Sequence, residues 1–282
     1  MKWNIITDSS CDLPAADSYP GDVQVSSIPF IISVGNRDFV DDGALDTEAM
    51  INAMEECTEI SHTSCPAPDS WIRQFEKAEQ SIVLTISSQL SGSMNSAMLA
   101  KDLVLEQHPD KRIAVLDSRS AGPELVLCVE EIRRLIEKGI DFDRVVSHAE
   151  AFFRKTKITF ALSSFNNLIK SGRMGKISGF VAQRLGMWGI GIGSEEGMIA
   201  VKGKTRGVSR ALSMLLKDMQ ERGFRGGRVA ISHCCNLKFA ELLKEHILQI
   251  WKNAEVSILP TRGICSFYAE RGGLIVSYPE CG

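Results

Sequence analysis

Short β-branched apolar runs alternate with amphipathic segments through the first half of this 282-residue chain. Their spacing predicts strands over 3–7, 23–34, 81–86 and 112–116, and helices over 46–56, 68–79, 98–107, 123–138 and 143–154. Strands that alternate with helices form a doubly wound sheet, because each crossover returns the chain parallel to the previous strand. We therefore expect an α/β domain with a mostly parallel sheet over residues 1–155.

Hairpins become more frequent in the second half. The pattern predicts strands over 157–162, 188–192, 198–201, 228–232, 256–259 and 274–276, and helices over 164–170, 177–185, 205–222 and 236–252. Fewer crossovers indicate an α+β domain with a mixed sheet over residues 156–282.

One polar stretch, residues 87–97, lies between a predicted strand and a predicted helix. The first N–H groups of a helix lack partners, and the helix dipole favours negative charge there. Gly92 would let an anion approach the backbone, and the hydroxyls of Ser91 and Ser93 add donors. No lysine follows as it does in a P-loop, so a carboxylate or a single phosphate fits better than a nucleotide. Ordinary helix capping by serines is the alternative.

Four polar loops, which contain Asp8, Thr63, Ser87 and Asp117, follow predicted strands or lie between predicted elements. In open parallel sheets ligands bind outside the carboxyl ends of the strands. We expect a ligand site at this edge, with Asp8 and Asp117 as hydrogen-bonding residues of the loops.

Composition excludes several classes of protein. The net charge of −3 argues against a nucleic-acid-binding face. No apolar run is long enough to span a membrane, and no signal peptide is recognisable, so we expect a cytoplasmic protein without stable membrane insertion. No C-x-x-C pair or zinc-finger spacing occurs, and we expect neither a metal nor a cofactor.

A serine hydrolase is the alternative function, with Ser91 or Ser93 as the nucleophile and His62, which adjoins Thr63, as the candidate base. There is no G-x-S-x-G elbow to support it. Arg173 and Arg206 lie in turns, where solvent exposure is the ordinary explanation; next to a bound anion they would suit phosphoryl transfer or docking.

Six motifs, in order and over nearly the whole chain, resemble the DegV family of bacterial fatty-acid-binding proteins. They are 6–14 (ITDSSCDLP), 63–66 (TSCP), 87–93 (SSQLSGS), 117–118 (DS), 171–176 (SGRMGK) and 202–207 (KGKTRG). The resemblance implies two α/β domains that hold a long-chain fatty acid in a buried tunnel, with the carboxylate at the domain junction.

The same resemblance implies roles for individual residues. Thr63 and Ser91 match the hydroxyls that hold the carboxylate, with the Gly92 N–H and Ser93 as helpers. Some family members present the fatty acid to a separate ATP-binding subunit of fatty acid kinase, and Arg173 and Arg206 are candidates for that surface.

Two positions depart from the family pattern. Tyr268 stands where the family often carries a histidine; its hydroxyl can donate a hydrogen bond but does not titrate near neutrality. The run 186–191 lacks the proline that is usual there. Ser64 and Tyr268 complete the candidate carboxylate site, and no residue is expected to be catalytic.

Overall fold

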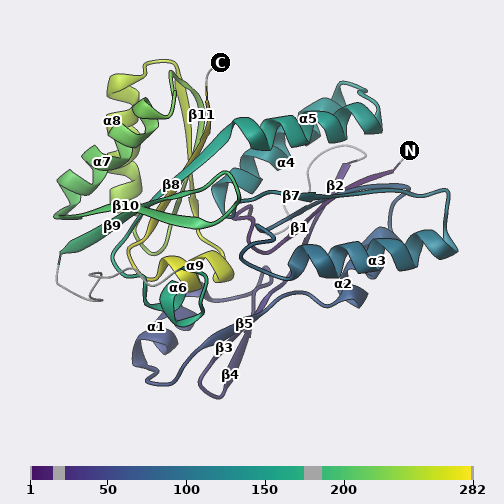
Figure 1. Ribbon diagram of the computed structural model, residues 1–282, viewed down its shortest axis with the longest axis horizontal. Helices are drawn as coiled ribbons and strands as arrows, with labels where there is room; N and C mark the ends of the chain where they lie inside the picture. The colour runs from purple at the N-terminus through teal and green to yellow at the C-terminus, as the bar shows by residue number, and fades with distance from the viewer. Residues whose placement is uncertain (1, 15–22, 175–185, 281–282) are drawn as a thin grey trace.

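The computed structural model describes residues 2–14, 23–174 and 186–280, and Figure 1 shows it as two sheet-containing halves. The N-terminal half contains a four-stranded sheet in the order β2-β1-β6-β7, in which every pair is parallel. Its strands are β1 (Trp3–Asp8), β2 (Val23–Ile28), β6 (Gln80–Thr85) and β7 (Arg112–Asp117). The predicted parallel sheet is confirmed.

Helices cover both faces of this sheet because successive side chains of a strand point to opposite sides. Ile6 and Val83 pack against α2 (Pro68–Phe75) and α3 (Ser93–Gln107). Ile5 and Ile82 pack against α4 (Pro123–Glu137) and α5 (Phe142–Lys155). This is the doubly wound arrangement that the alternation predicts.

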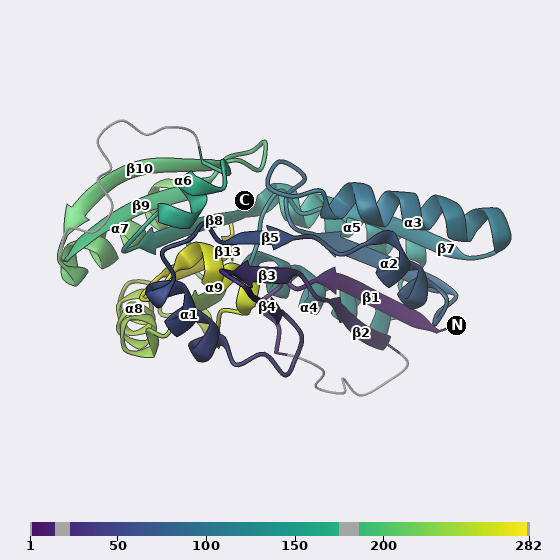
Figure 2. The same cartoon turned by 90° about the horizontal axis from the view of Figure 1, so that it is seen from below.

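A small antiparallel sheet, ordered β4-β3-β5, lies beside the parallel one (Figure 2). It consists of β3 (Ile31–Val34), β4 (Arg37–Val40) and β5 (His62–Ser64), and α1 (Thr47–Glu56) connects β4 to β5. The Asp46 side chain accepts a hydrogen bond from the Ala49 N–H and caps α1, as its residue type favours.

The C-terminal half contains a six-stranded mixed sheet in the order β10-β9-β8-β13-β11-β12, which confirms the predicted class. Its strands are β8 (Thr156–Leu162), β9 (Met187–Gly193), β10 (Ile199–Arg206), β11 (Gly227–His233), β12 (Ala254–Pro260) and β13 (Leu274–Pro279). The helices of this half are α6 (Asn166–Lys170), α7 (Val208–Glu221), α8 (Leu237–Ile250) and α9 (Gly263–Ala269). Residues of α7 and α8 form one apolar core with the sheet.

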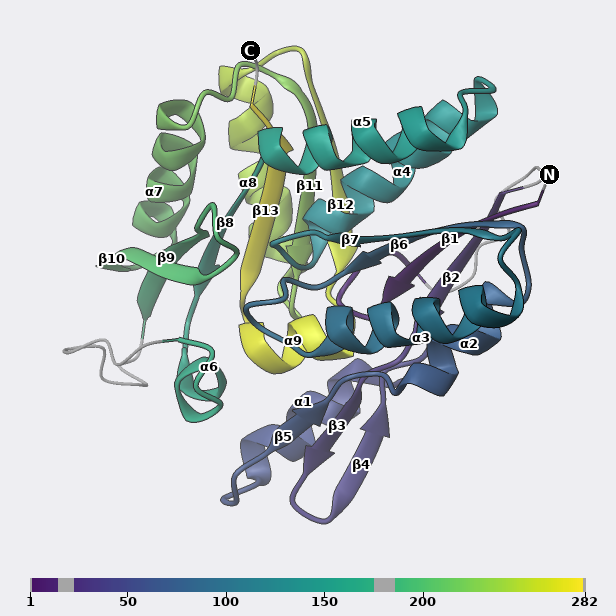
Figure 3. The same cartoon turned by 45° about the vertical axis from the view of Figure 1, so that its right-hand side comes forward.

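Helix α4 joins the two halves, since it contacts β1 on one side and β8, β11 and β13 on the other (Figure 3). Eleven of its fifteen residues are buried, as expected for a helix packed between two sheets. The chain passes from α5 directly into β8 at residues 155 and 156, where the sequence places the domain boundary. That boundary stays a prediction.

The structure corrects several details of the predicted elements. The strand expected over 23–34 is two strands, with β2 in the parallel sheet and β3 in the antiparallel one, and β10 extends to Arg206, so α7 begins at Val208 rather than at 205. Residues 62–64, expected in a loop, form β5, because they pair with β3. Helix α3 begins at Ser93 rather than at 98, and α9 was not predicted. The helix expected over 177–185 lies outside the described residues. Among the described helices, none is long and apolar enough to cross a membrane.

Candidate functional site

A cavity lies between the two halves and has predominantly apolar walls. The N-terminal half contributes Phe30 between β2 and β3, Thr63 of β5, and residues of the loops after β6 and β7. The C-terminal half contributes residues from β8, α6, β9, β10, α9 and β13 and from the segments after α6 and β9. Its apolar lining consists of Phe30, Ile86, Leu90, Ala121, Ile158, Phe160, Leu162, Leu168, Met198, Ile199, Ile264, Ala269 and Ile275. Such a surface suits an elongated apolar ligand.

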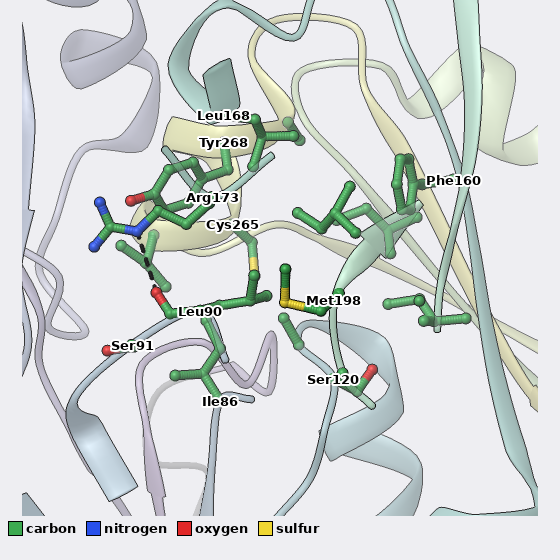
Figure 4. Close-up of a pocket in the computed structure, with 18 of the residues that line it drawn as sticks. Ile86, Leu90, Ser91, Ser120, Phe160, Leu168, Arg173, Met198, Cys265 and Tyr268 are labelled. Carbon is green, nitrogen blue, oxygen red and sulfur yellow. Dashed lines mark hydrogen bonds between the residues drawn. The ribbon is translucent and has the colours of Figure 1, made fainter. Parts of the chain in front are cut away.

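Hydroxyl groups gather at one end of this cavity. Ser91 of the β6–α3 turn, Tyr268 of α9 and Arg173 of the segment after α6 lie on the same side of it (Figure 4). Thr63 of β5 also lines the cavity. The Thr63 Oγ1 and Tyr268 hydroxyl oxygens are 3.0 Å apart and share a hydrogen bond. We call these four residues the polar end of the cavity.

Arg173 is fixed in this position by its neighbours. Its Nε donates to the Leu90 carbonyl oxygen at 3.1 Å, and its guanidinium carbon lies 5.9 Å from the centre of the Tyr268 ring. A guanidinium over an aromatic face is attracted by the ring. The polar end therefore carries one permanent positive charge beside its hydroxyl groups.

Four of the candidate residues lie outside the cavity lining. Ser93 is fully buried and donates its hydroxyl to the Asp8 carboxylate at 2.6 Å, so that this hydroxyl does not face the cavity. Gly92 precedes α3 without lining the cavity, and Ser64 is exposed beside Thr63 on β5. Arg206 is exposed at the end of β10, where it pairs in register with Met187.

The Asp8 carboxylate organises the loops behind the polar end. It accepts hydrogen bonds from the N–H and hydroxyl of Ser10, the N–H of Ile86 and the hydroxyl of Ser93. Burial raises the pKa of Asp8, and these hydrogen bonds oppose the rise. The ends of β1 and β6 and the start of α3 are thereby tied to a single side chain.

Asp117 holds the same turn from β7. Its two carboxylate oxygens accept hydrogen bonds from the N–H and the hydroxyl of Ser88. Asp8 and Asp117 therefore serve as hydrogen-bond acceptors for loops. Among the described residues no group of three or more His, Cys, Asp or Glu side chains is arranged to hold a metal ion.

A second buried carboxylate lies beyond the opposite end of the cavity. Glu124, at the start of α4, accepts hydrogen bonds from the hydroxyls of Ser120 and Thr156, and so links a loop of the parallel sheet to the first residue of β8. Burial raises the pKa of Glu124 to about 7, and the two hydroxyls oppose that rise. Sequence reasoning missed this residue, because a glutamate in the first turn of a helix is ordinary.

The described hydrogen bonds do not support a nucleophilic serine. Ser91 Oγ accepts from the Ser93 N–H at 3.2 Å, and Ser93 contacts Asp8. The Tyr268 hydroxyl bonds to Thr63, and no described hydrogen bond joins Ser91 or Ser93 to a histidine. A hydrolase needs such a base to activate the hydroxyl.

The fold and this cavity define a two-domain α/β protein with an apolar pocket between its domains. A sequence model of the DegV family matches residues 2–279. A DegV domain-containing protein of Streptococcus pneumoniae is 40% identical over 278 residues, which cover 99% of both chains. This chain belongs to the DegV family.

Solved structures of relatives superimpose over almost the whole chain. The Fak B3 protein of the S. pneumoniae fatty acid kinase, loaded with linoleic acid, has a TM-score of 0.96 and 40% identity, with all of both chains covered. A DegV family protein of Eubacterium eligens, loaded with heptadecanoic acid, has a TM-score of 0.94 and 33% identity, covering 99% of this chain and 100% of that one.

The raised pKa of Glu124 predicts a dependence of stability on pH. Its native carboxyl group holds a proton more tightly than the unfolded chain does between about pH 4.5 and about pH 7. The free energy of unfolding should therefore fall as the pH rises through this range, and Glu124→Gln should remove part of that fall. Urea unfolding at a series of pH values measures it.

The exposed Glu245 on α8 provides the matched control, because Glu245→Gln makes the same chemical change away from the buried network. Equal pH slopes for wild type and Glu124→Gln would contradict the assignment.

Proposed function

We propose that this protein binds one long-chain fatty acid, with its tail in the apolar cavity and its carboxylate at the polar end. The observation that supports this most strongly is that Thr63, Ser91 and Tyr268 lie together at one end of a predominantly apolar cavity. Relatives that are 33–40% identical over their full length were solved with fatty acids bound.

The hydrogen bonds at the polar end leave protons for a carboxylate. Because Ser91 Oγ accepts from the Ser93 N–H, the Ser91 hydroxyl can direct its own proton to the ligand. In the Thr63–Tyr268 pair one hydroxyl donates to the other, and the second proton remains for the ligand. Arg173 adds positive charge nearby. We assign Ser93 to positioning, and the Gly92 N–H and Ser64 remain part of the proposed set.

The tail supplies most of the affinity. Burial of about 14 methylene groups at roughly 0.8 kcal/mol each offers on the order of 11 kcal/mol. Association and ordering reduce this by several kcal/mol, which leaves binding in the micromolar range or tighter. The hydroxyls mainly prevent the burial of an unpaired carboxylate and so fix the direction of the ligand.

We propose further that the bound acid is presented to a separate ATP-binding kinase subunit. A relative that is 40% identical is the Fak B3 protein of a fatty acid kinase. Arg173 lies at the polar end. Arg206 is the last residue of β10, on the part of this strand that continues beyond the point where β8 ends. An arginine beside the bound carboxylate, with a second exposed on β10, would suit an ATP-bound partner. In this role the chain is non-catalytic and cytoplasmic and carries no cofactor.

Ser91→Ala should weaken fatty acid binding by about 1–3 kcal/mol, because the buried carboxylate loses a hydrogen-bond donor. Isothermal titration with a long-chain fatty acid measures the change. Ser213→Ala on α7 is the matched control, since Ser213 is exposed and, among the described residues, its hydroxyl donates to the Ser209 carbonyl oxygen of the same helix. An unchanged affinity in Ser91→Ala would remove Ser91 from the site.

Arg206→Ala should leave fatty acid affinity unchanged, because Arg206 does not line the cavity. It should lower kcat/KM for phosphorylation of the bound acid by about tenfold if this side chain docks the kinase subunit. Steady-state assays with purified kinase subunit and ATP measure it.

Arg144→Ala controls for loss of an exposed arginine, since that side chain is 80% exposed on α5 in the other half. Equal kcat/KM for Arg206→Ala and wild type would exclude Arg206 from the docking surface.

A further inference from the structure

Helix α9 belongs to the C-terminal half by sequence but packs against the N-terminal half. Along the chain it lies between β12 and β13, yet it contacts α1 and β3 (Figures 2 and 3). Its Ile264 and Phe267 share an apolar core with Ile32 of β3 and Met50 of α1. Four residues of α9 line the cavity, and they are Ile264, Cys265, Tyr268 and Ala269. The site is therefore complete only when α9 is held at a defined place on the N-terminal half.

Asp41 holds the first residues of α9. It is 1% exposed and directly follows β4, where its own N–H donates to the Phe30 carbonyl oxygen at 2.9 Å. Its Oδ1 accepts from the Gly263 N–H at 2.8 Å, and its Oδ2 accepts from the Ile264 N–H at 2.7 Å. A Cβ atom at 263 would lie 2.8 Å from Asp41 Oδ1, so this close approach of carboxylate and backbone requires glycine.

Arg262 fixes the residue just before α9 at three places in the N-terminal half. Its N–H donates to Asp12 Oδ1 at 2.8 Å, its Nη1 to the Ser27 hydroxyl oxygen at 2.7 Å and its Nη2 to the Asp41 carbonyl oxygen at 2.8 Å. Its Nε lies 3.8 Å from Asp41 Oδ1, so the guanidinium also compensates this buried negative charge. The start of α9 is therefore held by a residue of β2 and by the segments that follow β1 and β4.

The hydrogen-bond partner of Tyr268 is attached to the same small antiparallel sheet as Asp41. Thr63 lies on β5 and pairs in register with Ile32 of β3, and Ile32 pairs with Phe39 of β4, two residues before Asp41. The Thr63 Oγ1 and Tyr268 hydroxyl oxygens are 3.0 Å apart. This sheet thus carries one hydroxyl of the pair directly, and through Asp41 it holds the helix that carries the other.

Helix α9 is short enough to transmit a displacement from its start to Tyr268. Tyr268 comes five residues after Gly263, which corresponds to about 7.5 Å along a helix at about 1.5 Å per residue. A hydrogen bond between two hydroxyls is lost when their oxygens move apart by about 1 Å. Asp41 is not among the residues that line the cavity, so any effect it has on a ligand passes through α9.

We propose that Asp41 is a positioning residue for ligand binding: it holds α9 so that the Tyr268 hydroxyl meets Thr63 and the carboxylate of the ligand. This inference rests on the proposed fatty-acid function. Arg262 supports Asp41 in this role by fixing the residue before α9. The expected signature is coupling, because the effect of Asp41 on affinity depends on the Tyr268 hydroxyl.

The test is a double-mutant cycle in the full-length protein, with affinities for hexadecanoic and linoleic acid measured by isothermal titration. Asp41→Asn keeps the size of the side chain but replaces one acceptor oxygen with an NH2 group, which cannot accept from a backbone N–H. Asp41→Asn and Tyr268→Phe should each weaken binding about tenfold. In the Tyr268→Phe background, Asp41→Asn should add a change of no more than about twofold.

Asp141→Asn is the matched control. Asp141 accepts from the Arg144 N–H at the start of α5 and pairs with the Arg144 guanidinium, so the variant removes a similar carboxylate away from α9. It should change affinity by less than about twofold in either background.

Arg262→Lys keeps the test available if Asp41→Asn does not fold. It retains the positive charge but loses the guanidinium fork that reaches Ser27 and Asp41. It should weaken binding about fivefold in the wild type and by no more than about twofold in the Tyr268→Phe background.

Two results would overturn the inference. One is an equal loss from Asp41→Asn, or from Arg262→Lys, in both backgrounds, because Asp41 would then act on the overall structure and not through Tyr268. The other is an unchanged affinity in Tyr268→Phe. Failure of the wild type to bind either acid would instead contradict the proposed function.

Discussion

Buried and half-buried carboxylates that accept hydrogen bonds from loops determine the geometry around the cavity. Asp8 joins the ends of β1 and β6 to the start of α3, and Asp117 holds the following turn from β7. Glu124 joins the parallel sheet to β8 across the domain junction. A buried carboxylate without such donors would be strongly unfavourable, so each loop is held at a defined place. Ser91 lies in the turn that these hydrogen bonds hold, so the position of its hydroxyl is fixed with the turn.

The sequence predicted the layers of the fold well, because repeated apolar spacing marks long elements. It failed where local pattern carries little information. β5 has only three residues and forms by pairing with β3, about thirty residues earlier in the chain. α9 has seven residues, nearly all buried, and so lacks the polar face that makes a helix recognisable. Helix α3 starts early because the hydroxyl of Ser93 bonds to Asp8, a partner that no local motif specifies.

The candidate site was predictable only in part. Motif resemblance named Thr63, Ser91, Arg173 and Tyr268, and the structure brings these four together at one end of the cavity. It could not distinguish them from their neighbours, since the direction of each side chain depends on tertiary hydrogen bonds. The cavity wall gave no signal, because an apolar residue such as Ile158 has the same pattern in a strand whether it faces a ligand or the core.

The account depends on an acyl chain that occupies the space between the two halves. Native mass spectrometry of the purified protein, incubated with a long-chain fatty acid and then freed of excess ligand, tests this directly. It should show one added fatty acid per chain, and Ser91→Ala should retain less of it. A spectrum with the bare polypeptide mass alone, at every fatty acid tried, would contradict the account.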